Sequence, residues 1–143
     1  MKIKSENWVN IFTNLLILLW IYTAGSKILD FTMFRHELKL QNFSPSFVVA
    51  ISYALPVSEI IISVLLIIPK LKRIGLFVSL ILLTVFTIYI ILILLGFFKN
   101  VPCSCGGVLS LIGWNEHLFF NLFFLSANIM ILFILKRKEV PRN

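Results

Sequence analysis

The chain has 143 residues, of which 59% are hydrophobic and 13% are charged, and its formal net charge is +7. Soluble globular domains carry about 25% charged residues, so this composition excludes an ordinary soluble domain. The positive charge does not indicate a nucleic-acid partner, because the lysines and arginines cluster at the ends of apolar runs, where they orient membrane helices. We therefore expect a membrane protein whose main partner is the lipid bilayer.

Four apolar runs are long enough to cross a bilayer, which requires roughly 20 residues in a helix. They cover about residues 8–28, 47–68, 74–98 and 114–135. Each run must be helical, because lipid offers no hydrogen-bond partner to an unpaired peptide group. The sequence therefore predicts an all-α fold, a four-helix transmembrane bundle that forms one integral membrane domain over residues 1–143.

The distribution of lysine and arginine predicts the orientation of this bundle. Nine of these residues lie in the two ends of the chain and in the connection around residues 69–73, whereas four lie on the other side, three in the other two connections and Lys27 at the outer end of the first run. The positive-inside rule then places both termini in the cytoplasm. The connection after residue 98 would face the outer side of the cytoplasmic (inner) membrane, which is the periplasm where a cell has one.

The first connection, residues 28–46, is the longest polar stretch of the chain and mixes charged with apolar side chains. This mixture predicts a short amphipathic helix that lies at the membrane surface and ends near Ser44 and Pro45.

Ionisable residues inside the apolar runs are candidates for function, because they are costly in lipid. Glu59 is the only carboxylate deep in a run, and it shares one helical face with Ser52, Pro56 and Ser63. It is either an acid buried for packing, a proton acceptor coupled to redox chemistry, or a partner for Lys27. Lys27 lies near the outer end of the first run, where it either snorkels to the surface or, if the helix continues through residue 29, reaches Glu59.

Both cysteines of the chain, Cys103 and Cys105, lie in the connection before the fourth run, in the segment Val-Pro-Cys-Ser-Cys-Gly-Gly. A disulfide between residues i and i+2 closes a small, strained ring, which favours a labile redox pair over a structural one. Two alternatives stay open, namely two inert cysteines or a site for a soft metal such as Cu(I) or Hg(II). We prefer thiol–disulfide chemistry, under which no metal is expected.

The fourth run opens with Gly-Trp-Asn-Glu-His, and Trp114, His117, Asn121 and Asn128 share one helical face. Because His117 follows the cysteines closely, it is a candidate to pair with a thiolate or to relay its proton. Trp114 is typical of a membrane interface, and asparagines in such helices commonly form hydrogen bonds between helices.

Three features together resemble a known group of membrane proteins. These are Gly-Ser-Lys closing the first run at Lys27, the Pro56 and Glu59 pair in the second, and the cysteine segment that runs into Gly-Trp-Asn-Glu-His. The combination resembles the DoxX-like superfamily, most closely its MauE branch. The resemblance implies a four-helix membrane bundle that serves redox or thiol metabolism beside thioredoxin-like proteins outside the membrane. It implies a redox pair at Cys103 and Cys105, with supporting positions at Lys27, Glu59 and the Trp114–His117 segment.

The preferred hypothesis is a membrane thiol–disulfide redox protein that exchanges disulfides or electrons with an extracytoplasmic thioredoxin-like or disulfide-containing partner. Its expected catalytic residues are Cys103, Cys105, His117 and Glu59, and its supporting residues are Lys27, Trp114, Glu116 and Asn121. One cysteine pair is fewer than a full transmembrane relay uses, which favours either a partner subunit or a quinone bound between helices. The alternatives are capture and transport of copper or mercury, with Glu59 as an intramembrane site, and a non-catalytic anchor subunit.

Overall fold

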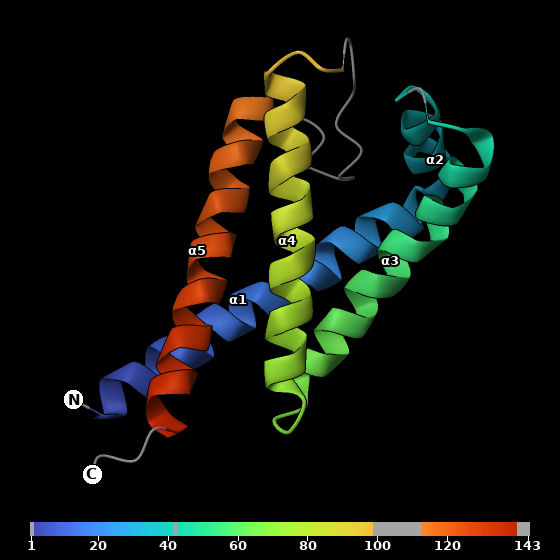
Figure 1. The fold of residues 1–143 in the computed structure, drawn as a ribbon. Helices are drawn as coiled ribbons and strands as arrows, with labels where there is room; N and C mark the ends of the chain where they lie inside the picture. The colour runs from blue at the N-terminus through green and yellow to red at the C-terminus, as the bar shows by residue number, and fades with distance from the viewer. Residues whose placement is uncertain (1, 42, 99–112, 140–143) are drawn as a thin grey trace.

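The structure, a computed structural model, describes residues 2–41, 43–98 and 113–139 (Figure 1). All regular secondary structure in these residues is helical, and four of the helices are long and apolar enough to cross a membrane. The prediction of an all-α four-helix bundle is thereby confirmed. The helices are α1 (Lys2–Leu29), α2 (Phe31–Lys39), α3 (Pro45–Ile67), α4 (Lys72–Leu94) and α5 (Trp114–Glu139).

The third predicted span was too long at its carboxyl end, because α4 ends at Leu94 and not near residue 98. Gly96 adopts a φ of 80°, in the left-handed region that favours glycine. Its N–H donates to the carbonyl of Ile93 at 2.9 Å, and the N–H of Phe97 donates to the carbonyl of Leu92 at 3.1 Å. These paired bonds end the helix, although the apolar run continues beyond the glycine.

The other ends differ from the predicted spans by a few residues, except that α1 begins at Lys2, well before the apolar run. α3 begins at Pro45, and the hydroxyl of Ser44 caps it by accepting from the N–H of Phe47 at 3.4 Å. α5 continues to Glu139, which extends the helix through its basic last turn. Apolar runs predict where a helix lies in lipid, whereas its ends depend on capping groups.

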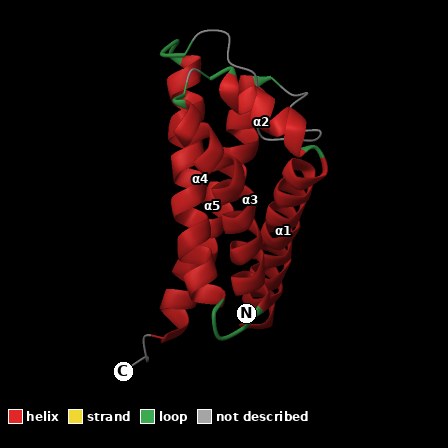
Figure 2. Cartoon of the chain, turned by 90° about the vertical axis from the view of Figure 1, so that its right-hand side faces the viewer, coloured by secondary structure: helices red, strands yellow, loops and turns green. Residues whose placement is uncertain are grey.

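The four long helices form a bundle in which α1 packs along α3 and α5, and α4 packs along α5 and α3. The start of α1 and the end of α5 lie at one end of the bundle, whereas α2 lies across the opposite end (Figure 2). At the shared end, Lys138 donates to Glu6 at 2.9 Å. This arrangement agrees with an even number of spans, which places both termini on one side.

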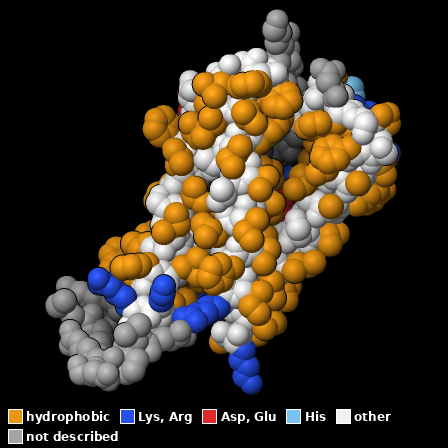
Figure 3. Space-filling model, viewed as in Figure 1, with side chains coloured by type: hydrophobic (Ala, Val, Ile, Leu, Met, Phe, Trp, Pro, Cys, Tyr) orange, Lys and Arg blue, Asp and Glu red, His pale blue; other side chains and the backbone are white. Residues whose placement is uncertain are grey.

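The bundle has an apolar core to which all four long helices contribute. Its buried members are Val9, Leu16, Trp20, Ile62, Leu66, Leu76, Leu83, Phe124 and Ile131. The outer surfaces of the same helices are also apolar, and Figure 3 shows hydrophobic side chains over most of the visible face. Lysine and arginine side chains gather at the end where the two termini lie (Figure 3). A helix that is apolar on all sides is typical of a membrane span.

Polar side chains tie the helices together inside this apolar interior. Trp20 of α1 donates from Nε1 to the hydroxyl of Ser79 on α4 at 2.9 Å, and the amide of Asn128 on α5 also lies 2.9 Å from that hydroxyl. Asn121 of α5 donates to the carbonyl of Leu83 at 3.0 Å and to the hydroxyl of Thr87 at 2.6 Å. Both asparagines therefore link α5 to α4.

The short helix α2 is amphipathic, as the sequence predicted for the first connection, but it ends at Lys39 and not near Ser44 and Pro45, which begin α3. Asp30 caps α2 by accepting from the N–H of Met33 at 3.3 Å, and Phe34 and Leu38 are buried against Val48 of α3. The helix thus packs on α3 through one apolar face and closes one end of the bundle.

Candidate functional site

The most unusual feature inside the bundle is a buried ion pair between α1 and α3. Lys27 donates from Nζ to Oε1 of Glu59 at 2.9 Å and to the carbonyl of Thr23 at 3.1 Å. The side chains of Lys27 and Glu59 are 2% and 1% exposed. The pair forms because α1 continues through Leu29, which places Lys27 about half a turn inside its end. Of the two sequence interpretations of Lys27, the structure therefore shows the contact with Glu59.

The ion pair leaves one of its polar atoms unsatisfied. Oε2 of Glu59 has no hydrogen-bond partner among the described residues. A buried polar atom without a partner is costly, because it has lost its hydration and gained nothing in return. In a site within the membrane, such an atom marks a place where another polar group or a water molecule can bind.

A small cavity of about 30 Å³ lies beside the ion pair. A cavity needs roughly 10–15 Å³ to hold one water molecule, together with two to four polar partners. Side chains from four helices line it, and they are Leu19, Trp20, Thr23, Lys27, Glu59, Leu83, Phe86, His117, Phe120 and Asn121. The cavity is therefore large enough, and polar enough, for water between Glu59 and His117.

His117 lies in the wall of this cavity and is 5% exposed. It belongs to the first turn of α5, where its N–H donates to the carbonyl of Gly113 at 3.0 Å. Its ring stacks on Trp114, with the centroids 6.2 Å apart and the planes 8° from parallel. The sequence associated His117 with the cysteines and Glu59 with Lys27, whereas the structure brings His117 and the ion pair to one cavity. Cys103 and Cys105 lie outside the described residues.

Tyr89 of α4 contacts the two described aromatic residues that flank the cysteine segment in the sequence, Phe98 and Trp114. Its ring centroid lies 5.8 Å from that of Phe98 and 6.5 Å from that of Trp114. Its hydroxyl donates to Oε1 of Gln41 at 2.6 Å. Residues 99–112 therefore connect two aromatic residues that both contact Tyr89. Tyr89 is the only tyrosine in the third apolar run, and this was the one signal in the sequence that could have identified it.

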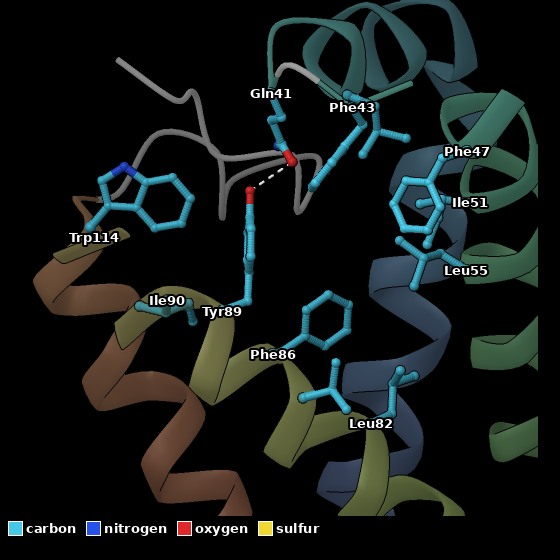
Figure 4. A pocket seen from close by; sticks show the side chains of 12 residues that line it. Gln41, Phe43, Phe47, Ile51, Leu55, Leu82, Phe86, Tyr89, Ile90 and Trp114 are labelled. Atoms are coloured by element: carbon cyan, nitrogen blue, oxygen red, sulfur yellow. Dashed lines mark hydrogen bonds between the residues drawn. The ribbon is translucent and has the colours of Figure 1, made fainter. Parts of the chain in front are cut away.

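A second and larger cavity, of about 210 Å³, lies next to Tyr89 (Figure 4). It lies between the half of α3 that follows Pro45 and the half of α4 that precedes Leu94. Phe86 lines both this cavity and the small one beside Glu59. A single aromatic side chain therefore borders an apolar chamber on one side and the buried charges on the other.

Residues 6–135 of the chain match the family model described as methylamine utilisation protein MauE. The chain belongs to the MauE family. No curated protein and no solved structure matches it. The matched region includes the ion pair, His117 and both cysteines, so this MauE family member is a multi-pass membrane protein whose candidate site lies wholly within the family region.

Two other predicted positions of this MauE family member differ in their surroundings. Asn121 lines the small cavity and links α5 to α4. Glu116 is exposed in the first turn of α5, and it is not among the residues that line either cavity. A carboxylate in that turn stabilises the helix through its dipole. Within the part of the chain that the structure describes, no group of three or more His, Cys, Asp or Glu residues is arranged to hold a metal ion.

Proposed function

We propose that this MauE family member is a membrane thiol–disulfide redox protein. In this proposal Cys103 and Cys105 face the outer side of the cytoplasmic membrane and exchange a disulfide with a thioredoxin-like or disulfide-containing protein. The observation that supports the proposal is the small cavity that His117 and the Lys27–Glu59 pair both line. Ionisable groups inside a membrane bundle commonly mark a path for protons or ions.

The chemistry of exchange explains why such groups are useful near a cysteine pair. A thiolate of the partner attacks one sulfur of the Cys103–Cys105 disulfide, which forms a mixed disulfide and releases the other cysteine as a thiolate. The partner's second thiol then resolves the mixed disulfide. Two electrons pass to the Cys103–Cys105 pair, which takes up two protons as it becomes a dithiol. The reverse exchange releases the same two protons.

His117 is the residue that we assign to proton transfer at the thiols, because an imidazole ring has one nitrogen that can donate a proton and one that can accept it. Glu59 is the proton acceptor deeper in the bundle, reached through the small cavity. Lys27 holds the Glu59 carboxylate in place through the 2.9 Å contact. Trp114 orients the His117 ring by stacking on it.

Chain connectivity supports this assignment. Five peptide units join Phe98 to Cys103, and a fully extended chain of that length spans at most about 18 Å. Phe98 and Trp114 both contact Tyr89, so the cysteine segment is tethered at both ends near the start of α5.

Trapping the mixed disulfide tests the proposal directly. Cys103→Ser and Cys105→Ser variants are expressed separately, and adducts are sought on non-reducing gels and identified by mass spectrometry. We expect one single variant to accumulate a covalent adduct that disappears on reduction and is absent from the double Cys→Ser variant. If neither single variant forms an adduct and the double variant retains full function, the proposal is wrong.

A metal titration distinguishes the proposal from soft-metal capture. The reduced protein is titrated with Cu(I) and with Hg(II), and in parallel it is mixed with an oxidised thioredoxin-like protein. We expect the thiols to become oxidised in the mixture. Tight metal binding without any disulfide exchange would overturn the redox proposal.

A further inference from the structure

The larger cavity has the size of a binding site for a ring. Its volume is about 210 Å³, whereas an apolar cavity of about 150 Å³ already admits benzene. It lies between α3 and α4, and side chains of α2 and α5 also line it (Figure 4). The chamber can therefore hold one six-membered ring with substituents.

The walls of this cavity are suited to a flat, apolar molecule. They are formed by Leu38, Gln41, Phe43, Phe47, Ile51, Leu55, Leu82, Val85, Phe86, Tyr89, Ile90 and Trp114. Five of these side chains are aromatic, and aromatic side chains pack favourably against the faces or edges of other rings. Two polar side chains of the lining, Gln41 and Tyr89, are joined by their 2.6 Å hydrogen bond in an otherwise largely apolar chamber (Figure 4).

The cavity also communicates with the lipid-facing surface. Phe47 of α3 and Val85 of α4 line it, and about half of each side chain is exposed on the outside of the bundle. Figure 3 shows this face hollowed between the two helices. A ligand can therefore enter from the bilayer, and a hydrocarbon tail attached to it can stay in lipid.

We infer that this cavity binds the ring of an isoprenoid quinone, whose tail leaves between α3 and α4 into the bilayer. The inference rests on the proposed function, because it names the co-substrate that would exchange electrons with the cysteine pair. An acyl chain would fill the apolar chamber, but it would have no use for the Tyr89–Gln41 pair. A quinone ring carries carbonyl oxygens, one of which could replace Gln41 as the acceptor of the Tyr89 hydroxyl.

The redox step balances without a further reactant. Oxidation of the Cys103–Cys105 dithiol breaks two S–H bonds and forms one S–S bond, which releases two electrons and two protons. The quinone takes up both electrons, and each of its carbonyl oxygens takes up one proton to give the quinol. Phe86 lines both cavities, so the ring would lie next to the chamber that contains Glu59 and His117.

Photolabelling tests the site independently of the thiols. The protein is reconstituted in phosphatidylcholine nanodiscs with a photoreactive azido-ubiquinone, and labelled peptides are identified by mass spectrometry. We expect labelling at residues 47–55 and 82–90 that decylubiquinone displaces. The double Cys103→Ser and Cys105→Ser variant should be labelled to the same extent, because the cavity does not include those residues.

Two blocking variants and a matched control locate the site. Val85→Trp places a large ring at the mouth of the cavity, whereas Ile88→Trp changes the same helix outside the cavity. Val85 and Ile88 are 55% and 54% exposed, so the two substitutions perturb the lipid surface equally. We expect at least a tenfold higher half-displacing concentration of decylubiquinone for Val85→Trp and no change for Ile88→Trp. Leu55→Trp blocks the same cavity from α3 and should behave like Val85→Trp.

The outcomes separate this inference from its rivals and from the proposed function. If oleate displaces the label as effectively as decylubiquinone, the cavity is an acyl-chain site and the inference is overturned. Labelling spread over all lipid-facing helices, and unaffected by Val85→Trp and Leu55→Trp, would also overturn it. Site-specific labelling without any trapped mixed disulfide would support the quinone site while contradicting thiol exchange with a partner protein.

Discussion

Lys27 and Glu59, which are 32 residues apart in the sequence, meet inside the bundle at a distance of 2.9 Å. Only one carboxylate oxygen is used in this contact, and Oε2 has no partner among the described residues. A buried ion pair contributes little net stability, because desolvation of two charges offsets most of their attraction. In the proposed function, Glu59 accepts a proton at this site.

Breaking the pair by one substitution should be more harmful than removing it altogether. Glu59→Gln and Lys27→Met each leave the partner buried without its counter-charge, and we expect each to cost about 3–5 kcal/mol of unfolding free energy. The double variant should recover part of that loss. Equilibrium unfolding in mixed micelles measures the unfolding free energy of the two single variants and of the double variant.

The exposed contact between Lys138 and Glu6 provides the control, because these side chains are 39% and 63% exposed. Glu6→Gln should cost less than about 1 kcal/mol. If the effects of Glu59→Gln and Lys27→Met simply add in the double variant, the two residues are not coupled.

Gly75 should tolerate no side chain, because α3 passes very close to it. A Cβ atom at this position would lie 3.0 Å from the backbone of Leu65 and Leu66. Gly75→Ala must therefore push α3 and α4 apart, and we expect a loss of about 1–3 kcal/mol. Gly25→Ala is the matched control, since nothing lies within 4 Å of the added atom. It should be neutral or slightly stabilising, because alanine favours helix over glycine. Equal thermal midpoints for both variants would contradict the close contact.

His117→Phe should slow thiol exchange while leaving the bundle folded, because phenylalanine can keep the stacking on Trp114 but cannot carry a proton. We expect at least about a tenfold lower rate of mixed-disulfide formation, since positioned general acids and bases contribute about 10²–10⁴-fold. Stopped-flow mixing with a reduced thioredoxin-like protein measures the rate. His36→Phe, at an exposed position of α2, is the control. Equal rates in both variants would remove His117 from the mechanism.

The orientation of the bundle can be checked with a maleimide that does not cross membranes. We expect it to label Cys103 and Cys105 in intact spheroplasts after mild reduction. In the double Cys→Ser background, Glu6→Cys should be labelled only after the membrane is permeabilised, because the positive-inside rule places that end in the cytoplasm. The opposite pattern would reverse the topology and exclude an extracytoplasmic partner.

The helical architecture follows closely from the sequence, because the length and apolarity of a membrane span are local properties. The pairing of Lys27 with Glu59 could also be predicted from the sequence. An acid in a polar stripe of one helix and a lysine near the end of another have few other polar partners in lipid. The end of α4 was predicted wrongly, because apolar residues continue past Gly96 and hydropathy does not register the glycine that ends the helix.

The sequence did not predict that His117 and Glu59 share a cavity, or that Tyr89 contacts Phe98, Trp114 and Gln41. Such neighbours depend on how four helices cross, and helical periodicity shows only which residues share a face of one helix. The larger cavity could not be predicted from the sequence for the same reason, because its walls come from four separate helices.

The position of Glu59 also bears on how the chain is made. Glu59 is the fifteenth of the 23 residues of α3, and its counter-charge belongs to a helix that leaves the ribosome earlier. An ionised side chain near the centre of an inserting helix costs about 2.5–3.5 kcal/mol at the translocon. If α1 stays beside the translocon until α3 arrives, Lys27 neutralises that charge during insertion. Biosynthesis of this bundle thus favours lateral association of α1 with α3 before α4 and α5 are inserted into the membrane.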